Sequence, residues 1–142
     1  MLLEYGVEDP NAKDIEGKTP LIFAVIGGSY NTTKLLIAHE ADINGSDLLG
    51  YAPIHYAVGA DGGISILKLL IENGTYLNIK DHDGYSALHH AVHLDLIEYV
   101  IVLFQSGALL NVKDHSNLTP IEYCLQKKKV DVFKSIIALI FK

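Results

Sequence analysis

Thr19-Pro20-Leu21-Ile22-Phe23-Ala24 is one of four related segments that are spaced evenly along this chain. The other three are Ala52-Pro53-Ile54-His55-Tyr56-Ala57, Ser86-Ala87-Leu88-His89-His90-Ala91 and Thr119-Pro120-Ile121-Glu122-Tyr123-Cys124. An aspartate precedes each segment, and these aspartates, Asp14, Asp47, Asp81 and Asp114, recur at intervals of 33, 34 and 33 residues. Landmarks that stay in phase over three periods indicate a repeat protein.

Each repeat predicts a turn followed by two helices. The residue three positions after each aspartate suits a turn that needs positive φ; these residues are Gly17, Gly50, Gly84 and Asn117. Thr19-Pro20 and Thr119-Pro120 predict helix starts, with a hydroxyl cap and a proline in the first helical position. The second helices are the apolar ones and contain residues 34–37, 67–71 and 99–104. One such unit cannot bury its apolar face alone, so neighbouring units are expected to stack.

The period and the segments resemble the ankyrin repeat, whose signature is Thr-Pro-Leu-His-x-Ala. His55 and His89 keep the signature histidine, whereas Ile22 and Glu122 replace it. The resemblance implies an all-α ankyrin-repeat solenoid of about four repeats plus a partial N-terminal unit. The expected divisions are a partial repeat over 1–13, repeats over 14–46, 47–80 (with one inserted residue) and 81–113, and a C-terminal repeat over 114–142.

Several positions depart from the family pattern. The extra residue of the second repeat falls in 59–63, between its helices, and Glu40 stands where the family usually has a closing glycine. Residues 2–6 look like the end of a second helix without a first one, and residues 132–141 are apolar around much of a helix. Terminal repeats normally carry a polar outer face. We therefore expect a piece of a longer array, or a stack whose end packs on something else.

The composition excludes several partners. The formal net charge is −6, and all eleven basic residues are lysine. Without arginine, and with an acidic balance, the chain is not expected to bind nucleic acid. The longest apolar run, residues 136–141, is too short to span a bilayer, so no membrane association is expected. A single cysteine, Cys124, and no basic and apolar leader at the N-terminus favour a soluble, cytoplasmic protein.

The polar clusters have structural interpretations that we favour over chemical ones. His89 and His93 lie four residues apart, a spacing that suits a metal, but His89 holds the signature position, which in this family hydrogen-bonds the neighbouring turn. Residues 81–84 lack the glutamate of a calcium loop, and residues 59–63 lack the lysine of a phosphate loop. Cys124 replaces a packed alanine. We expect no metal, no cofactor and no enzymatic activity, because no acid, base and nucleophile come together.

The resemblance also carries over the partner-binding positions, which in this family are the turn tips and the first helices of a concave groove. The residues so placed are Ile15, Glu16, Lys18, Leu48, Leu49, Tyr51, His82, Asp83, Tyr85, His93, Leu94, His115 and Leu118. Apolar and aromatic side chains recur at these tips, which predicts a contact strip with Tyr51 and Tyr85 as anchors. The predicted function is a protein–protein interaction module. The alternatives are a structural segment that self-associates through the apolar C-terminal helix, and a host-directed effector of a microbe or virus.

Overall fold

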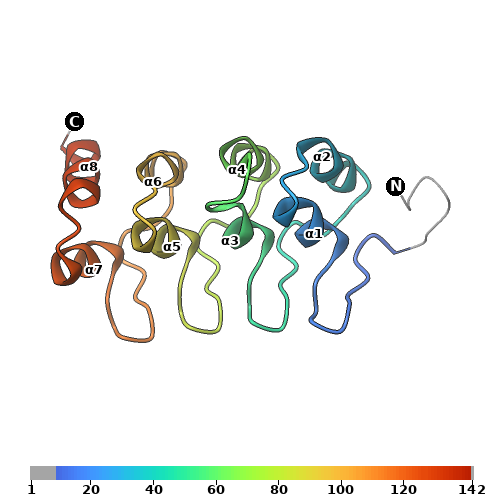
Figure 1. The fold of residues 1–142 in the computed structure, drawn as a ribbon, viewed down its shortest axis with the longest axis horizontal. Coiled ribbons are helices and arrows are strands. Elements are labelled where there is room, and N and C mark those ends of the chain that lie inside the picture. The colour runs from blue at the N-terminus through green and yellow to red at the C-terminus, as the bar shows by residue number, and fades with distance from the viewer. Residues whose placement is uncertain (1–8, 142) are drawn as a thin grey trace. The chain divides into compact units, whose positions relative to one another are not determined.

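The computed structural model describes residues 9–141 and divides the chain into two compact units, Met1–Tyr76 and Leu77–Lys142. Each unit contains two turn–helix–helix repeats (Figure 1), and residues 9–141 contain no strand. The helices of the first unit are α1 (Pro20–Ile26), α2 (Tyr30–Ala38), α3 (Pro53–Ala57) and α4 (Gly63–Glu72). Those of the second are α5 (Ala87–His93), α6 (Ile97–Gln105), α7 (Pro120–Lys127) and α8 (Val130–Ile140). The all-α prediction is confirmed; the helix end predicted at 2–6 lies outside the described residues.

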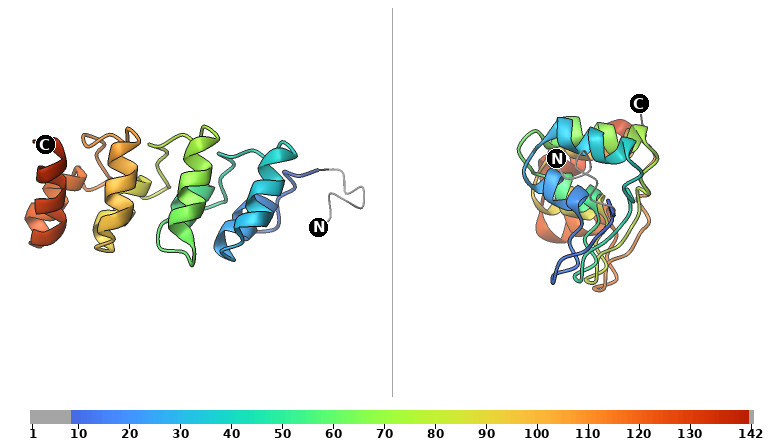
Figure 2. Two further views of the ribbon diagram at one scale, coloured as in Figure 1. Left: turned by 90° about the horizontal axis from the view of Figure 1, so that it is seen from above. Right: turned by 90° about the vertical axis from the view of Figure 1, so that its right-hand side faces the viewer.

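In each unit the helices form two layers. In the first unit α1 packs on α3 and α2 packs on α4, so first helices lie beside first helices and second beside second (Figure 2). The second unit repeats this arrangement, with α5 on α7 and α6 on α8. Fully buried aliphatic side chains fill the space between the layers; examples are Leu21, Ile54 and Leu67 in the first unit and Leu88 and Leu103 in the second. Burial of this apolar surface between neighbouring repeats stabilises each unit.

The helices begin where the capping signals predict. Thr19 Oγ1 accepts a hydrogen bond from the backbone N–H of Ile22 at 3.2 Å. Thr119 and Glu122 form a reciprocal capping box, in which Thr119 Oγ1 accepts from the Glu122 N–H at 3.2 Å and Glu122 Oε2 accepts from the Thr119 N–H at 2.9 Å. Each bond satisfies a donor that would otherwise lack a partner at a helix start.

The turns are held by their aspartates. Oδ1 of Asp47 accepts the N–H groups of Leu49 and Tyr51 at 2.9 and 3.0 Å, and Asp14, Asp81 and Asp114 repeat the pattern. The positive φ predicted three residues later is present, at 80° for Gly17, 82° for Gly50, 84° for Gly84 and 65° for Asn117. The turns are therefore specified by local sequence.

The asparagines link successive repeats. Asn44 Oδ1 accepts from the Tyr76 N–H at 2.9 Å and from Thr75 Oγ1 at 3.3 Å, and Asn78 Oδ1 accepts from the Leu109 N–H at 2.9 Å. Each bond ties one turn to the loop that follows the second helix of the next repeat. These side chains fix the spacing between repeats within a unit.

The departures noted in the sequence have structural consequences. Glu40, in place of glycine, adopts a left-handed φ of 65° after α2, a conformation that costs a residue with a Cβ about 1 kcal/mol. The insertion forms a loop with positive φ at Gly59 and Gly62, although Gly63 already belongs to α4. None of the helices described within residues 9–141 is long and apolar enough to cross a membrane.

Candidate functional site

The turn tips of the first unit expose three aliphatic side chains. Ile15 is 93% exposed, Leu48 66% and Leu49 63%. The two tips are joined, because the Leu48 N–H donates to the Glu16 carbonyl at 3.0 Å. Gly17 allows this approach, since a Cβ there would lie 2.9 Å from the Leu48 nitrogen. The result is a fixed apolar strip, which we call the aliphatic tip strip and define as Ile15, Leu48 and Leu49.

Tyr51 differs from the strip because it is half-buried. Its ring meets His55 edge-on at 5.8 Å and Tyr56 at 5.5 Å, measured between centroids. The Tyr56 hydroxyl donates to Asp47, and burial together with this carboxylate raises the pKa of Tyr56. Tyr51 therefore packs its ring against the first helix of its repeat and exposes only part of the ring to solvent. Beside the strip, Lys18 is half-buried and pairs with the exposed Glu16 at 3.2 Å.

The tips of the second unit are polar. His82, Asp83 and His115 are all exposed, and the His115 N–H donates to the Asp83 carbonyl at 3.4 Å. The two tips approach closely, since a Cβ on Gly84 would lie 2.5 Å from Cδ2 of His115. Leu118 is half-buried. The second unit thus holds its tips in the same way as the first, but presents imidazole and carboxylate groups.

Three rings meet behind these polar tips. The His93 ring lies 4.7 Å from Tyr85 in a T-shaped contact and 3.8 Å from Tyr123, tilted by 33°. Together with Asp114 they line a cavity of about 390 Å³, whose other lining residues are Ser116, Leu118, Gln126 and Lys127. We call this cavity the aromatic pocket. Its rings come from α5, α7 and the turn before α5, so that two neighbouring repeats build it.

His93 is the least satisfied side chain of the aromatic pocket. Its Nε2 is buried and has no hydrogen-bond partner. Burial, and secondarily the neighbouring His90 and His89, lower the pKa of His93 to about 4. The imidazole is therefore neutral at pH 7, and Nε2 is available to a partner that can approach it.

The other histidines of α5 are engaged within the protein. His89 is fully buried; its Nδ1 accepts from the Ser86 N–H at 3.1 Å and its Nε2 lies 3.4 Å from the Leu118 carbonyl. This is the contact with the neighbouring turn that the family resemblance implies. His90 Nε2 bonds Asp81 Oδ2 at 2.7 Å. Although burial acts to raise the pKa of Asp81, the hydrogen bonds from the Tyr85 backbone N–H and from His90 hold this pKa below its usual range. Both rings act structurally here.

The remaining candidates fall outside these two sites. Leu94 is exposed just after α5. Cys124 is buried, and burial raises the pKa of its thiol, as expected for a packing residue. Lys129 donates to the His93 carbonyl at 3.1 Å and pairs with Asp95 at 3.0 Å, because the loop after α5 brings a carbonyl and a carboxylate within its reach.

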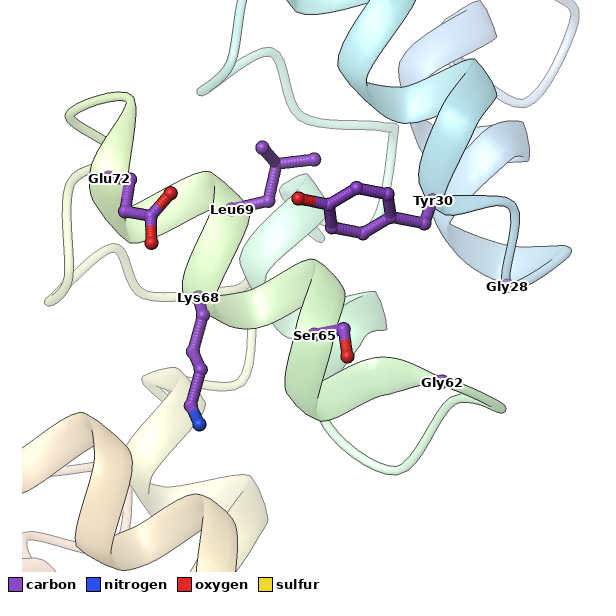
Figure 3. Close-up of a pocket in the computed structure, with 7 residues that line it drawn as sticks. All are labelled: Gly28, Tyr30, Gly62, Ser65, Lys68, Leu69 and Glu72. Atoms are coloured by element: carbon purple, nitrogen blue, oxygen red, sulfur yellow. The ribbon is translucent and has the colours of Figure 1, made fainter.

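A second cavity opens between α2 and α4 of the first unit, as Figure 3 shows. Its volume is about 470 Å³, and Tyr30 points across it toward Leu69. Its lining residues are Gly28, Tyr30, Gly62, Ser65, Lys68, Leu69 and Glu72. Sequence reasoning did not anticipate this cavity, because it depends on how α2 and α4 pack together.

Sequence reasoning also missed Phe23 and Tyr123. Each stands nine residues after a turn aspartate, the register that holds Tyr56 and His90 in the other repeats. Phe23 is half exposed and belongs to the same repeat as Ile15 of the aliphatic tip strip. Tyr123 forms a wall of the aromatic pocket. The register was visible in the sequence; a comparison of this position among the four repeats would have found both.

Comparison with known proteins agrees with the repeat structure. A family model described as ankyrin repeats (3 copies) matches residues 1–81 and 54–140. The chain therefore belongs to the ankyrin-repeat family, whose members are typically non-enzymatic modules for protein–protein interaction.

Two similar curated proteins share one description, "Arf-GAP with coiled-coil, ANK repeat and PH domain-containing protein 2", from Homo sapiens and Oryctolagus cuniculus. Each is 41% identical over 56 residues, which is 39% of this chain. The match spans 7% of the length of these relatives. The similarity to these two proteins is therefore limited to a short segment of ankyrin repeats.

Proposed function

We propose that this chain is a protein-binding module whose partner lies across the turn tips and first helices. The observation that carries this proposal is the aliphatic tip strip. Isolated exposed apolar side chains are ordinary, but Ile15, Leu48 and Leu49 lie together on two tips joined by a hydrogen bond. A partner that covers them gains the free energy of removing apolar surface from water, without first ordering the tips.

The first helices extend this surface. Phe23 and Ile26 on α1 are half exposed, on the same repeat that carries Ile15. In the second unit the corresponding tips offer His82, Asp83 and His115, which would contribute hydrogen bonds and charge rather than apolar area. The first unit thus offers apolar contacts and the second unit offers polar contacts, which contribute mainly to specificity.

The test is affinity capture from cell lysate with three baits, read by quantitative mass spectrometry. The baits are the wild type, the triple variant Ile15→Ser/Leu48→Ser/Leu49→Ser, and Tyr76→Ser. Tyr76 is a matched control because it is 68% exposed in the same unit, after α4 and away from the tips. A partner retained by wild type and Tyr76→Ser but lost with the triple variant supports the proposal. Identical capture by all three baits contradicts it.

A second candidate function is self-association through α8. Phe141, just after this helix, is 79% exposed, and Ile140 and Val130 are also exposed. Light scattering over a range of concentrations tests this candidate. A mass that rises toward a dimer in wild type and not in Phe141→Lys supports it, and a monomeric mass at every concentration removes it.

A further inference from the structure

The aromatic pocket combines aromatic walls with a carboxylate. Tyr85, His93 and Tyr123 supply the rings, and Asp114 is the one acidic residue that lines the cavity. The cavity volume of about 390 Å³ is enough for one long side chain and too small for a folded element. Its lining therefore suits a ligand group that is both positively charged and able to lie against aromatic faces.

Asp114 differs from Asp47 and Asp81 in a way that leaves its second carboxylate oxygen available. It differs from Asp14, which also accepts hydrogen bonds only at Oδ1, because Asp14 is exposed. The second carboxylate oxygen of Asp47 accepts from the Tyr56 hydroxyl, and that of Asp81 bonds His90. At Asp114 the structure shows donors only to Oδ1, from the Ser116 and Leu118 N–H groups at 2.8 and 3.0 Å. Tyr123 holds the position that would complete the bond, but its ring stacks on His93. Asp114 is nevertheless buried.

The electrostatic environment of the pocket is negative on the side of Tyr85. Burial raises the pKa of Tyr85, and the charges of Asp114, Asp83 and Asp81 raise it further. Lys127 is the cation that lines the cavity, and it is exposed at the end of α7, so its flexible side chain can turn toward water. Lys129 is held by Asp95 and the His93 carbonyl. Burial of a carboxylate without a neighbouring cation carries a desolvation cost. A cation supplied by a ligand would offset that cost at Asp114.

We infer that the aromatic pocket binds the cationic side chain of a lysine or arginine from a protein partner. The charged group lies against the Asp114 carboxylate, and the alkyl stem lies along the aromatic wall that Tyr85, His93 and Tyr123 form. This inference rests on the proposed function, because it names what one part of the partner-binding face recognises. It assigns the second unit a basic residue in the partner, while the aliphatic tip strip of the first unit takes an apolar one.

The experiment uses the whole chain, labelled with ¹⁵N, and three small probes. These are N-acetyl-lysine N-methylamide, N-acetyl-arginine N-methylamide and their uncharged analogue N-acetyl-norleucine N-methylamide. Amide signals of Tyr85, Ser116, Leu118 and Tyr123 are followed by NMR as each probe is added. We expect saturable shifts with a cationic probe, with a Kd on the order of millimolar, and no saturation with the norleucine probe.

The decisive variant is Asp114→Asn, which retains an oxygen able to accept the Ser116 and Leu118 N–H groups but removes the charge. It should weaken binding of the cationic probe by about tenfold or more. Tyr123→Leu is a second variant that removes an aromatic wall and leaves the turn untouched, so it decides the matter if Asp114→Asn does not fold. The control is Ser106→Ala, because Ser106 is exposed at the end of α6, outside the pocket.

Absent saturation, equal shifts with norleucine, or unchanged binding in whichever of the two pocket variants folds would overturn the inference. The proposed function is tested separately by the capture experiment, which uses only first-unit variants. Capture that depends on the aliphatic tip strip, together with silent probes, would leave the proposed function standing and remove the pocket. Probe binding without capture that depends on the aliphatic tip strip would support the pocket and contradict the proposed function.

Discussion

The tips of the first unit and those of the second share one backbone design but differ in the side chains they present. In both, an aspartate accepts two backbone N–H groups, and a glycine with positive φ brings neighbouring tips into contact. The first unit places Ile15, Leu48 and Leu49 at the tips, whereas the second places His82, Asp83 and His115 there. The turn is specified by a few residues, and the others are free to determine what is bound.

Behind the tips, the repeat of Asp47 in the first unit and the repeat of Asp114 in the second differ in how the aspartate is used. In the first unit Tyr56 completes the hydrogen bonds of Asp47, so that carboxylate is used internally. In the second unit the equivalent Tyr123 turns to His93, and Asp114 is left with backbone donors only. The partner of one tyrosine therefore makes the difference. Tyr56 bonds the turn aspartate Asp47, whereas Tyr123 contacts His93 and leaves Asp114 lining a pocket.

The largest effect is expected from adding a methyl group where two tips touch. Gly84→Ala should destabilise the second unit by about 3 kcal/mol, because the left-handed φ is unfavourable and the Cβ would lie 2.5 Å from His115. Gly74→Ala is the matched control, with the same φ of 84° and nothing within 4 Å of the added Cβ; it should lose only about 1 kcal/mol. Urea unfolding measures both. Equal losses would show that the tip contact contributes nothing.

Acid should weaken the second unit through His93. Its pKa is lowered from 6.5 to about 4 in the folded chain, so the unfolded chain binds the proton more strongly. The full unfolding free energy is therefore present above pH 6.5, where His93 is neutral in both states. As the pH falls from 6.5 toward 4, the unfolding free energy decreases by roughly 2 kcal/mol, after allowing for the partial exposure of the ring. His93→Phe keeps a ring against Tyr123 and removes the titration. Its unfolding free energy should therefore fall less over this range; an unchanged pH slope would contradict the assignment.

The asparagine links predict a smaller difference between the units. Asn44→Ala removes acceptors from both the Tyr76 N–H and the Thr75 hydroxyl, whereas Asn78→Ala removes one from the Leu109 N–H. At about 1 kcal/mol per hydrogen bond, Asn44→Ala should cost about twice as much as Asn78→Ala. Thermal or urea unfolding of the two variants, measured side by side, checks the ratio. A larger loss for Asn78→Ala would show that these hydrogen bonds do not determine the strength of the links.

The smallest effect is a gain in stability. Glu40→Gly should raise the unfolding free energy by about 1 kcal/mol or slightly less, because glycine adopts the left-handed φ of 65° without strain but also has more freedom when unfolded. Glu40→Ala, which keeps a Cβ, is the control and should show no such gain. A loss of stability in Glu40→Gly would mean that the glutamate side chain itself stabilises the end of α2.

The sequence was sufficient for features that depend on neighbouring residues. The aspartate–glycine turns and the Thr19 and Thr119 caps follow local rules, and the structure confirms them. Glu40, which stands where the family usually has a closing glycine, adopts the left-handed conformation that glycine favours.

The aromatic pocket could not be predicted, because its rings come from residues about thirty positions apart. His93 was placed among the binding residues, but its contact with Tyr123 depends on how α5 packs beside α7. Tyr51 and Tyr85 were expected to be anchors on the surface, and the structure shows them half-buried among other rings. Burial of a ring at a turn depends on the side chains of the adjacent helix, which a repeat motif does not specify.

The affinity of a captured partner for three forms of the chain tests whether the turn tips of the first unit are the binding surface. Kd is measured for the wild type, for Ile15→Ser/Leu48→Ser/Leu49→Ser and for Tyr76→Ser, after circular dichroism has shown equal folding. We predict that the triple variant binds at least about tenfold more weakly, because the three side chains lose apolar contact, while Tyr76→Ser binds like the wild type. Equal affinity of the triple variant and the wild type would contradict the assignment of the tips as the binding surface.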